Sequence, residues 1–422
     1  MACVNESVDS AERATQATAA DTLWLVAAVA ALNVLAYVDR QLLVAVAPLL
    51  IADLGLSRAQ IGLLVGGTFI VVFAVGTLVV GVLADRYNRP RLIALGLAVW
   101  SAATALTSTA SGLASLAFWR VLVGAGEAGL PPTALSMVSD RVAGRHLAVA
   151  TSLYYAGVPV GFALSFALSG AIAPRLGWRA CFLLLGLGGV ACALLVLRLA
   201  DPPRRVGRAT GSRGPGLASA LRERPMVVVL TAAATLLVYA SASSQHTITW
   251  LVSERGFPYS RAAFLSAGVI LAAGLLGSLA IGALADRALR LHPAGRLLVL
   301  AGVSAIGLAA AAAFYTLPPA SPAFFVAWFV AQAYLLGWYG SLVAAVAERA
   351  PAERRASVIG FLLLALNLLG VATGPFVTGL VADRSSLTQA LIWSLTPAVL
   401  GTLILAAAFA SEWRAARHAP NG

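Results

Sequence analysis

Lysine is absent from this chain, and charged residues of every kind are scarce. Its 422 residues include 29 basic residues, all of them arginine, against 17 acidic ones, which gives a net charge of +12. Only 11% of the residues are charged and 60% are hydrophobic, whereas about a quarter of the residues of a soluble domain are charged. The composition excludes an ordinary soluble protein and predicts a polytopic membrane protein.

Cysteine is also rare. Cys3, Cys181 and Cys192 have spacings that match no zinc, haem or disulfide pattern, and no P-loop is present. Two of the cysteines lie in an apolar segment, where we expect them to be small buried hydrophobes. We therefore predict no metal and no bound cofactor. Residues 1–21 lack the apolar core of a secretory signal and are expected to form a short disordered tail.

Apolar runs of about 20 residues, enough to cross a bilayer, occur twelve times. They lie near residues 23–50, 59–84, 91–110, 113–138, 147–172, 179–198, 226–252, 262–285, 296–316, 322–347, 357–382 and 387–410. The sequence therefore predicts an all-α integral membrane protein with twelve transmembrane helices.

The arginines are distributed unevenly between the two sides of these spans. The connections after even-numbered runs, together with both tails, hold 21 of the 29 arginines, and those after odd-numbered runs hold six. Because arginine is retained on the cytoplasmic side, we expect both termini to be cytoplasmic, in a cell membrane of the bacterial inner-membrane type. The basic residues are scattered over short loops without an aromatic platform, which excludes nucleic acid as a partner.

The longest connection divides the spans six and six. It is rich in proline, glycine and arginine, and it predicts five parts: a tail at 1–22, a six-helix bundle at 23–198, a linker at 199–225, a second bundle at 226–411 and a tail at 412–422. Short motifs repeat between the halves at offsets of 201 to 209 residues, which indicates a duplicated, pseudo-symmetric unit. A substrate site is expected where the two bundles meet, near the midplane.

One repeated motif lies at the predicted cytoplasmic ends of spans 2 and 8. It has a glycine, then an acid and an arginine, and we predict that it forms a cytoplasmic gate with the acid that ends span 4. Its members are Gly81, Asp85, Arg86, Arg89, Asp140, Asp286 and Arg287. The alternative is that these arginines only set the topology.

The first copy of this motif resembles the signature of the major facilitator superfamily, although Asn88 replaces the second glycine and Pro90 the following base. A narrower resemblance, to the Spinster family, covers Tyr37-Val38-Asp39-Arg40, the 81–89 motif and residues 120–128. It implies a transporter of lysolipids or sphingosine phosphate, with proton coupling in the bacterial members. Sugar-acid and organic-anion branches share some of these features.

Four charges lie inside predicted spans, where a charge costs several kcal/mol. Asp39 and Arg40 are in span 1, and Arg120 and Glu127 are in span 4. Their depths allow Arg40 to meet Glu127 and Asp39 to meet Arg120. We hypothesise that the two acids carry the coupling proton and that the two arginines are their charge partners or substrate headgroup ligands, as the resemblance also implies. The alternative is two static ion pairs that hold the helices together.

Other polar or small residues within the spans are possible cavity-lining positions: Asn33, Tyr37, Gly124, Tyr239, His246, Gln332, Trp338 and Asn367. Aromatic packing or helix–helix hydrogen bonding would explain them equally well. We predict a monomeric, proton-coupled transporter in the lipid bilayer, not an enzyme, that works by alternating access on a small-molecule or lipid substrate. An amphiphilic lysolipid or sphingolipid is the first candidate, and small organic anions, sugar acids or drugs are the alternative. Polar side chains in both walls of the cavity would favour the organic anion.

Overall fold

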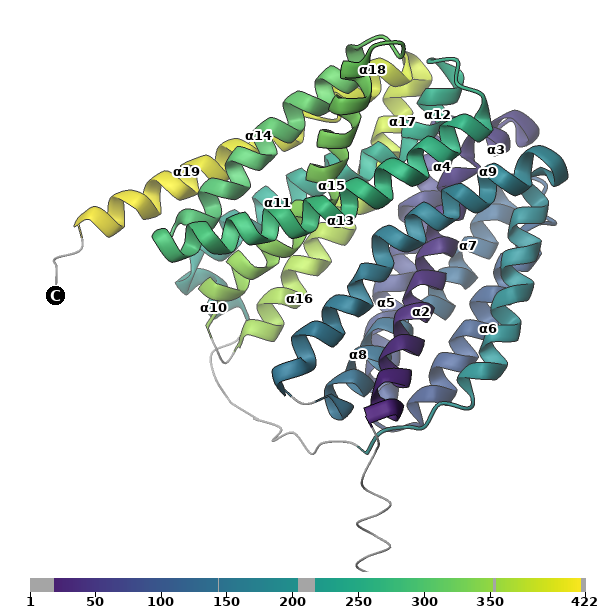
Figure 1. Ribbon diagram of the computed structural model, residues 1–422, viewed down its shortest axis with the longest axis horizontal. Helices are drawn as coiled ribbons and strands as arrows, with labels where there is room; N and C mark the ends of the chain where they lie inside the picture. The colour runs from purple at the N-terminus through teal and green to yellow at the C-terminus, as the bar shows by residue number, and fades with distance from the viewer. Residues whose placement is uncertain (1–18, 143, 204–216, 352–353, 419–422) are drawn as a thin grey trace, which may run out of the picture.

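The computed structural model describes residues 19–142, 144–203, 217–351 and 354–418. All regular structure in these ranges is helical, and Figure 1 shows a bundle of long, roughly aligned helices. The predicted tails and linker lie partly outside the described residues.

Eight helices lie in the described part of the first half of the chain. They are α2 (Ala19–Ala45), α3 (Ala47–Leu54), α4 (Arg58–Val65), α5 (Gly67–Ala84), α6 (Arg89–Thr107), α7 (Leu113–Glu127), α8 (Leu130–Arg141) and α9 (Gly144–Val196).

The second half follows a short helix α10 (Leu217–Glu223). It contains α11 (Pro225–Ser243), η1 (Ser244–His246), α12 (Thr247–Ser253), α13 (Tyr259–Leu291), α14 (Gly295–Thr316), α15 (Pro322–Arg349), α16 (Arg355–Ala365), the π-helix η3 (Leu366–Val371), α17 (Gly374–Arg384), α18 (Leu387–Trp393) and α19 (Thr396–His418).

Eleven helical stretches among the described residues are long and apolar enough to cross a membrane. One of them, Val149–Val196, has 48 residues, about 70 Å of helix and more than twice a bilayer core. It is broken at Gly177, whose φ of 79° is a left-handed conformation that favours glycine. Counting the two segments separately gives the twelve predicted crossings, with boundaries that differ from the expected ones by up to seven residues.

Several crossings are interrupted near their middle, at glycine or proline. Span 2 breaks between α4 and α5 at Gly66, and span 4 breaks between α7 and α8, where prolines begin the next helix. Such breaks are where long helices bend. Large apolar side chains such as Leu78 and Leu279 are exposed on the outside of the bundle, as expected for surfaces that face lipid.

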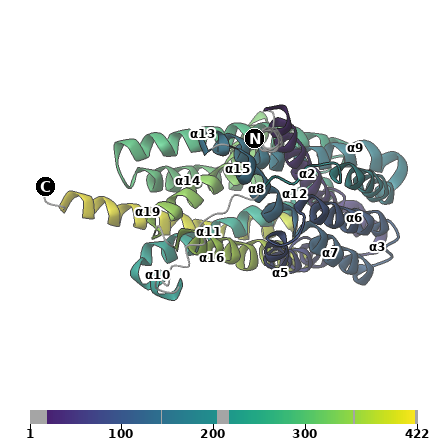
Figure 2. The same cartoon turned by 90° about the horizontal axis from the view of Figure 1, so that it is seen from below.

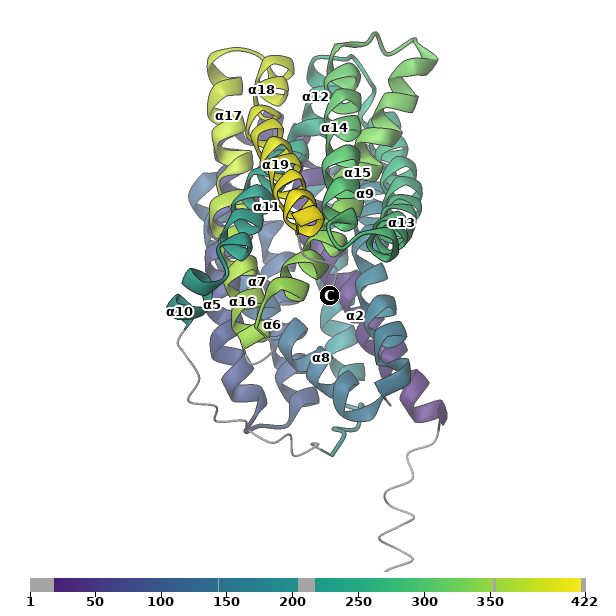
Figure 3. The same cartoon turned by 90° about the vertical axis from the view of Figure 1, so that its left-hand side faces the viewer.

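The two halves of the chain meet mainly at one end of the molecule. Contacts between them join α4 to α17, α9 to α13, α3 to α12 and α5 to η3. We call this the Gly177 end, after the break in α9, and the opposite end the Arg89 end, after the first residue of α6. In Figure 1, α3, α4, α12 and α17 lie close together near the top, whereas the ribbons of the two halves diverge toward the bottom. Figure 2, seen from below, shows the helices of the two halves as two adjoining groups. In Figure 3, seen from the left of Figure 1, the helices of the second half lie in front of those of the first.

Candidate functional site

The intramembrane charges come together on α2 and α7. Arg40 Nε donates to Glu127 Oε2 at 2.5 Å, so this predicted pair is formed. The Glu127 side chain is fully buried, and that of Arg40 is 17% exposed. The arginine is therefore the member of this pair that a molecule from outside can reach.

The second predicted pair is also present but looser. Arg120 Nη1 lies 3.8 Å from Asp39 Oδ1, with both side chains 3% exposed. The hydroxyl of Thr104, on α6, donates to the other carboxylate oxygen of Asp39. Among the described residues, no hydrogen bond reaches Asp39 Oδ1, Arg120 Nε or Glu127 Oε1. These buried atoms retain hydrogen-bonding capacity that the protein does not use.

Aromatic rings surround the arginines. The guanidinium carbon of Arg40 lies 4.9, 5.1 and 4.3 Å from the ring centres of Tyr37, Phe69 and Phe73, and that of Arg120 lies 4.8 Å from Phe69. At these distances the rings attract a cation. Gly124 makes the arrangement possible, because a Cβ there would lie 2.9 Å from the Phe69 carbonyl oxygen. The absence of a side chain at Gly124 therefore lets α7 approach α5 closely.

A cavity of about 230 Å³ lies between the two halves, toward the Gly177 end of this charge cluster. Its lining from the first half is Gln41, Val44, Phe162 and Phe166, and from the second half Val238, Ser241, Ala242, Ser244, Gln245, Thr247, Ile248, Ser266, Ile270, Trp328, Gln332, Leu335, Leu336 and Val371. The Tyr37 ring connects cluster and cavity, because it packs on Arg40 and lies 5.6 Å from the ring of Phe162. Six of the fourteen lining residues from the second half are polar, so the cavity has polar side chains in both of its walls.

Of the residues predicted to line a cavity, Gln332 is in this lining. Asn33 donates to the Tyr154 carbonyl oxygen on α9 at 2.7 Å, and Asn367 donates to its own helix. His246 lies 2.8 Å from the Pro375 carbonyl oxygen, Trp338 Nε1 donates to Ser241 Oγ at 3.4 Å, and Tyr239 is partly buried on α11. None of these five residues is in the cavity lining, although Trp338 bonds to Ser241, which is.

Two residues of the site were missed by the sequence-based reasoning. Gln41 follows Arg40 and lies one helical turn after Tyr37, so its polarity inside a span was a usable signal. Thr104 carried no signal, because only the packing of α6 on α2 brings its hydroxyl to Asp39.

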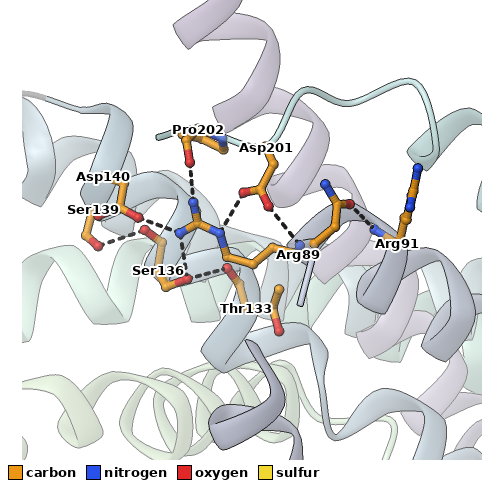
Figure 4. A network of polar contacts seen from close by, with 9 residues as sticks. Arg89, Arg91, Thr133, Ser136, Ser139, Asp140, Asp201 and Pro202 are labelled. Carbon is orange, nitrogen blue, oxygen red and sulfur yellow. Dashed lines mark hydrogen bonds and ion pairs between the residues drawn. The ribbon is translucent and has the colours of Figure 1, made fainter. Parts of the chain in front are cut away.

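Near the Arg89 end, Arg89 forms the centre of a polar network (Figure 4). Its guanidinium contacts Asp140 at 2.5 Å, Asp201 at 2.7 Å, the Pro202 carbonyl oxygen at 2.5 Å and Ser136 Oγ at 3.1 Å. The network joins α6 and α8 to the segment that follows α9. Asp201 was assigned to the linker from the sequence, and the structure makes it a second carboxylate partner of Arg89.

The second half repeats this network with different residues. Arg296, at the start of α14, contacts Asp286 at 2.9 Å and Glu348 at 3.0 Å. The exposed Asp85, Arg86 and Arg287 have no ion pair among the described residues. Around Gly81 a Cβ would meet only Pro132, at 4.0 Å, and around Gly282 it would meet open space. Each network joins helices of one half, and neither bridges the two halves.

A family model of the Major Facilitator Superfamily matches residues 29–375. The chain belongs to this superfamily, whose members are multi-pass membrane transporters and not enzymes. A similar relative is an MFS-type efflux pump of Mycolicibacterium smegmatis, 28% identical over 85% of this chain and 84% of the relative. A 3-(3-hydroxy-phenyl)propionate transporter of Escherichia coli is 29% identical over 77% of this chain and 78% of the relative.

The fold is that of known superfamily structures. The crystal structure of a bacterial homologue of the human lysosomal transporter Spinster, in an inward-facing and unoccupied conformation, superimposes with a TM-score of 0.83. That similarity covers 94% of this chain and 99% of the other, at 22% identity. The resemblance predicted from the motifs is thus confirmed at the level of family and fold.

Proposed function

We propose that this protein is a proton-coupled transporter of a small organic anion, with an aromatic carboxylic acid as the type of substrate. The observation that carries the proposal is Arg40, a partly exposed guanidinium inside the bundle that is held by a fully buried acid and surrounded by aromatic rings. A guanidinium binds a carboxylate through two parallel hydrogen bonds, and the rings provide apolar surface beside it.

Coupling follows from competition for this arginine. When a substrate carboxylate takes the place of Glu127 on Arg40, the Glu127 carboxylate loses its partner in a buried site. An unpaired buried charge is costly, so Glu127 takes up a proton as the substrate binds. Asp39, with Arg120 and Thr104, is the second proposed proton carrier, and its looser pair opens more readily. The coupling ion is the proton, and no other cofactor is part of the proposal.

The cavity favours a small substrate over a lysolipid. Polar side chains line it in both halves, with Gln41 on one side and Gln245 and Gln332 on the other. This is the feature expected for an organic anion. The Escherichia coli relative that transports an aromatic acid supports the same class.

The second candidate is an amphiphilic lysolipid or sphingolipid. It is favoured by the motif resemblance and by the similarity of this fold to the Spinster homologue. The apolar side chains of Val44, Phe162 and Phe166 in the cavity wall would face its chain.

We further infer the division into bundles at 23–198 and 226–411, a monomeric state and cytoplasmic termini. With that orientation the Gly177 end faces outward and the Arg89 end faces the cytoplasm. The exposed Asp85, Arg86 and Arg287 then lie where the diverging halves would meet after inward closure, and the Arg89 and Arg296 networks would hold each half rigid beside them.

Uptake by the purified protein in liposomes tests the proposal. An imposed pH gradient, applied in either direction, should drive transport of 3-(3-hydroxyphenyl)propionate, and a lysophospholipid should move more slowly. Glu127→Gln should abolish the dependence on the gradient, because glutamine fills the same space and takes up no proton. Arg40→Gln should abolish transport, and Glu223→Gln, which changes an acid on α10 away from the spans, is the matched control.

Transport that ignores the pH gradient in the wild-type protein would refute coupling. A wild-type gradient response in Glu127→Gln would exclude Glu127 as a carrier. Movement of the lysophospholipid but not of the acid would replace the first substrate class by the second.

A further inference from the structure

Three glutamine side chains line the cavity, and none has a hydrogen-bond partner among the described residues. Gln41 comes from α2, Gln245 from η1 and Gln332 from α15. Gln41 is only 7% exposed as a residue and Gln245 and Gln332 are partly buried, so the three amides are open to the cavity and little exposed elsewhere. A primary amide offers two donors and an acceptor, and leaving such groups unpaired in a buried site costs free energy.

Two serines in the same lining differ from these glutamines, because other groups of the protein already pair with their hydroxyls. Ser244 Oγ donates to the Ser241 carbonyl oxygen at 2.6 Å, and Ser241 Oγ accepts from Trp338 Nε1. Buried polar groups in folded proteins are nearly always paired. Three amides without a protein partner that face one cavity are therefore available to hydrogen-bond a molecule bound there.

The position of Gln41 relates these amides to the charge cluster. Tyr37 and Gln41 are four residues apart on α2 and so share a face, and the Tyr37 ring packs on Arg40. A molecule whose carboxylate reaches Arg40 past Tyr37 thus extends its other end along this face toward Gln41. Gln245 and Gln332 approach the same space from the second half.

We propose that Gln41, Gln245 and Gln332 form a subsite for a neutral hydrogen-bonding group, such as a hydroxyl, at the end of the substrate remote from its carboxylate. This inference rests on the proposed function and narrows its substrate class to hydroxylated acids. A second carboxylate is excluded, because no Asp, Glu, Arg or His lines the cavity and a buried charge without a partner is costly.

The subsite also joins the two halves. Gln41 belongs to the first half and the other two glutamines to the second, so one hydroxyl that donates to one side and accepts from the other bridges them. Such a bridge forms only while the two halves are in contact at the Gly177 end. The hydroxylated acid therefore binds this arrangement of the protein more tightly than an arrangement in which the halves separate at the Gly177 end. A ligand with different affinities for two arrangements shifts the equilibrium between them.

The test uses three compounds that differ in one group each: 3-(3-hydroxyphenyl)propionate, 3-phenylpropionate without the hydroxyl, and 3-(3-hydroxyphenyl)propanamide without the charge. Binding is measured on the detergent-purified full chain by calorimetry. Wild type should bind the hydroxylated acid about tenfold more tightly than 3-phenylpropionate, the effect of leaving buried amides unpaired. Gln41→Leu and Gln332→Leu should each reduce this ratio toward one with 3-phenylpropionate binding retained.

The matched control is Gln389→Leu, since Gln389 is exposed on α18 and should leave the ratio unchanged. A wild-type ratio in both cavity variants would overturn the subsite while leaving the proposed function intact. If neither acid binds, the proposed function fails, and binding of 3-(3-hydroxyphenyl)propanamide then tests the subsite. Binding of this compound that Gln41→Leu weakens supports the subsite. Binding that neither variant changes, or no binding at all, overturns the subsite.

Discussion

Asp383 joins the two halves of the protein by hydrogen bonds at the Gly177 end. It lies at the end of α17 in the second half, and its carboxylate oxygens accept from the backbone N–H groups of Arg58 and Ala59, at 2.9 and 3.0 Å. These donors belong to the first turn of α4 in the first half. Arg58 Nη1 also donates to the Ala382 carbonyl oxygen at 2.9 Å. A carboxylate at a helix N-terminus is stabilised by unpaired N–H groups and by the helix dipole.

We predict that Asp383→Ala weakens this closed end. Loss of a capping side chain costs about 1 kcal/mol, and because Asp383 is exposed to solvent we use that figure without a further term for charge. It corresponds to about a fivefold shift of the equilibrium toward arrangements in which the two halves separate at this end. Asp383→Asn should shift it less, because asparagine caps helices nearly as well as aspartate.

Distance distributions between two spin labels measure the shift. Labels on Ala52→Cys in the first half and Ala320→Cys in the second, both exposed near the Gly177 end, are introduced into a protein without its native cysteines. Asp383→Ala should enlarge the long-distance population, and Asp383→Asn should lie between it and the wild type. An unchanged distribution in Asp383→Ala, or a larger effect of Asp383→Asn, would refute the capping argument.

Two further predictions concern the same end. Gly62→Ala should also separate the halves, because its Cβ would lie 2.2 Å from a carbonyl oxygen of α17, whereas Gly282→Ala, which points into open space, should leave the label distances and stability nearly unchanged. The pKa of Asp53 lies below its ordinary value of 3.8 because Arg179 and Trp178 donate hydrogen bonds to its carboxylate. Its contribution to stability is therefore complete above about pH 4 and is lost as the pH falls through the lowered pKa. Thermal unfolding followed from pH 6 downward should show this loss in the wild type, and an equal acid dependence in Asp53→Asn would contradict it.

Much of the architecture follows from one-dimensional patterns. Run length and arginine distribution predict the spans, and all twelve are found once the break at Gly177 is counted. The pairing of Arg40 with Glu127 and of Asp39 with Arg120 is also predictable, because the depth of a residue in a membrane helix follows from its position in the run. The family follows from motifs that are local in the sequence.

Contacts between elements that are distant in the sequence could not be predicted in this way. Arg89 was expected to pair with Asp140, and it also holds Asp201, which is 112 residues away in a segment that carried no span pattern. The predicted cavity residues illustrate the same limit, since Asn33 and His246 bond to the backbone of other helices while only Gln332 reaches the cavity. A polar residue within a span is predicted to need a hydrogen-bond partner, but the sequence does not predict which group becomes that partner.

The sequence by itself therefore determined the membrane class, the number of crossings, the duplicated plan and the four charges that form the cluster. These depend on composition, on run length and on the fixed rise of a helix, which are properties of single segments. The tertiary structure decided that Gln41 faces a cavity without a partner, that Thr104 bonds to Asp39 and that Asp383 caps a helix of the other half. Those outcomes depend on how each helix is rotated and tilted against its neighbours, and that is set by the packing of all the side chains at once.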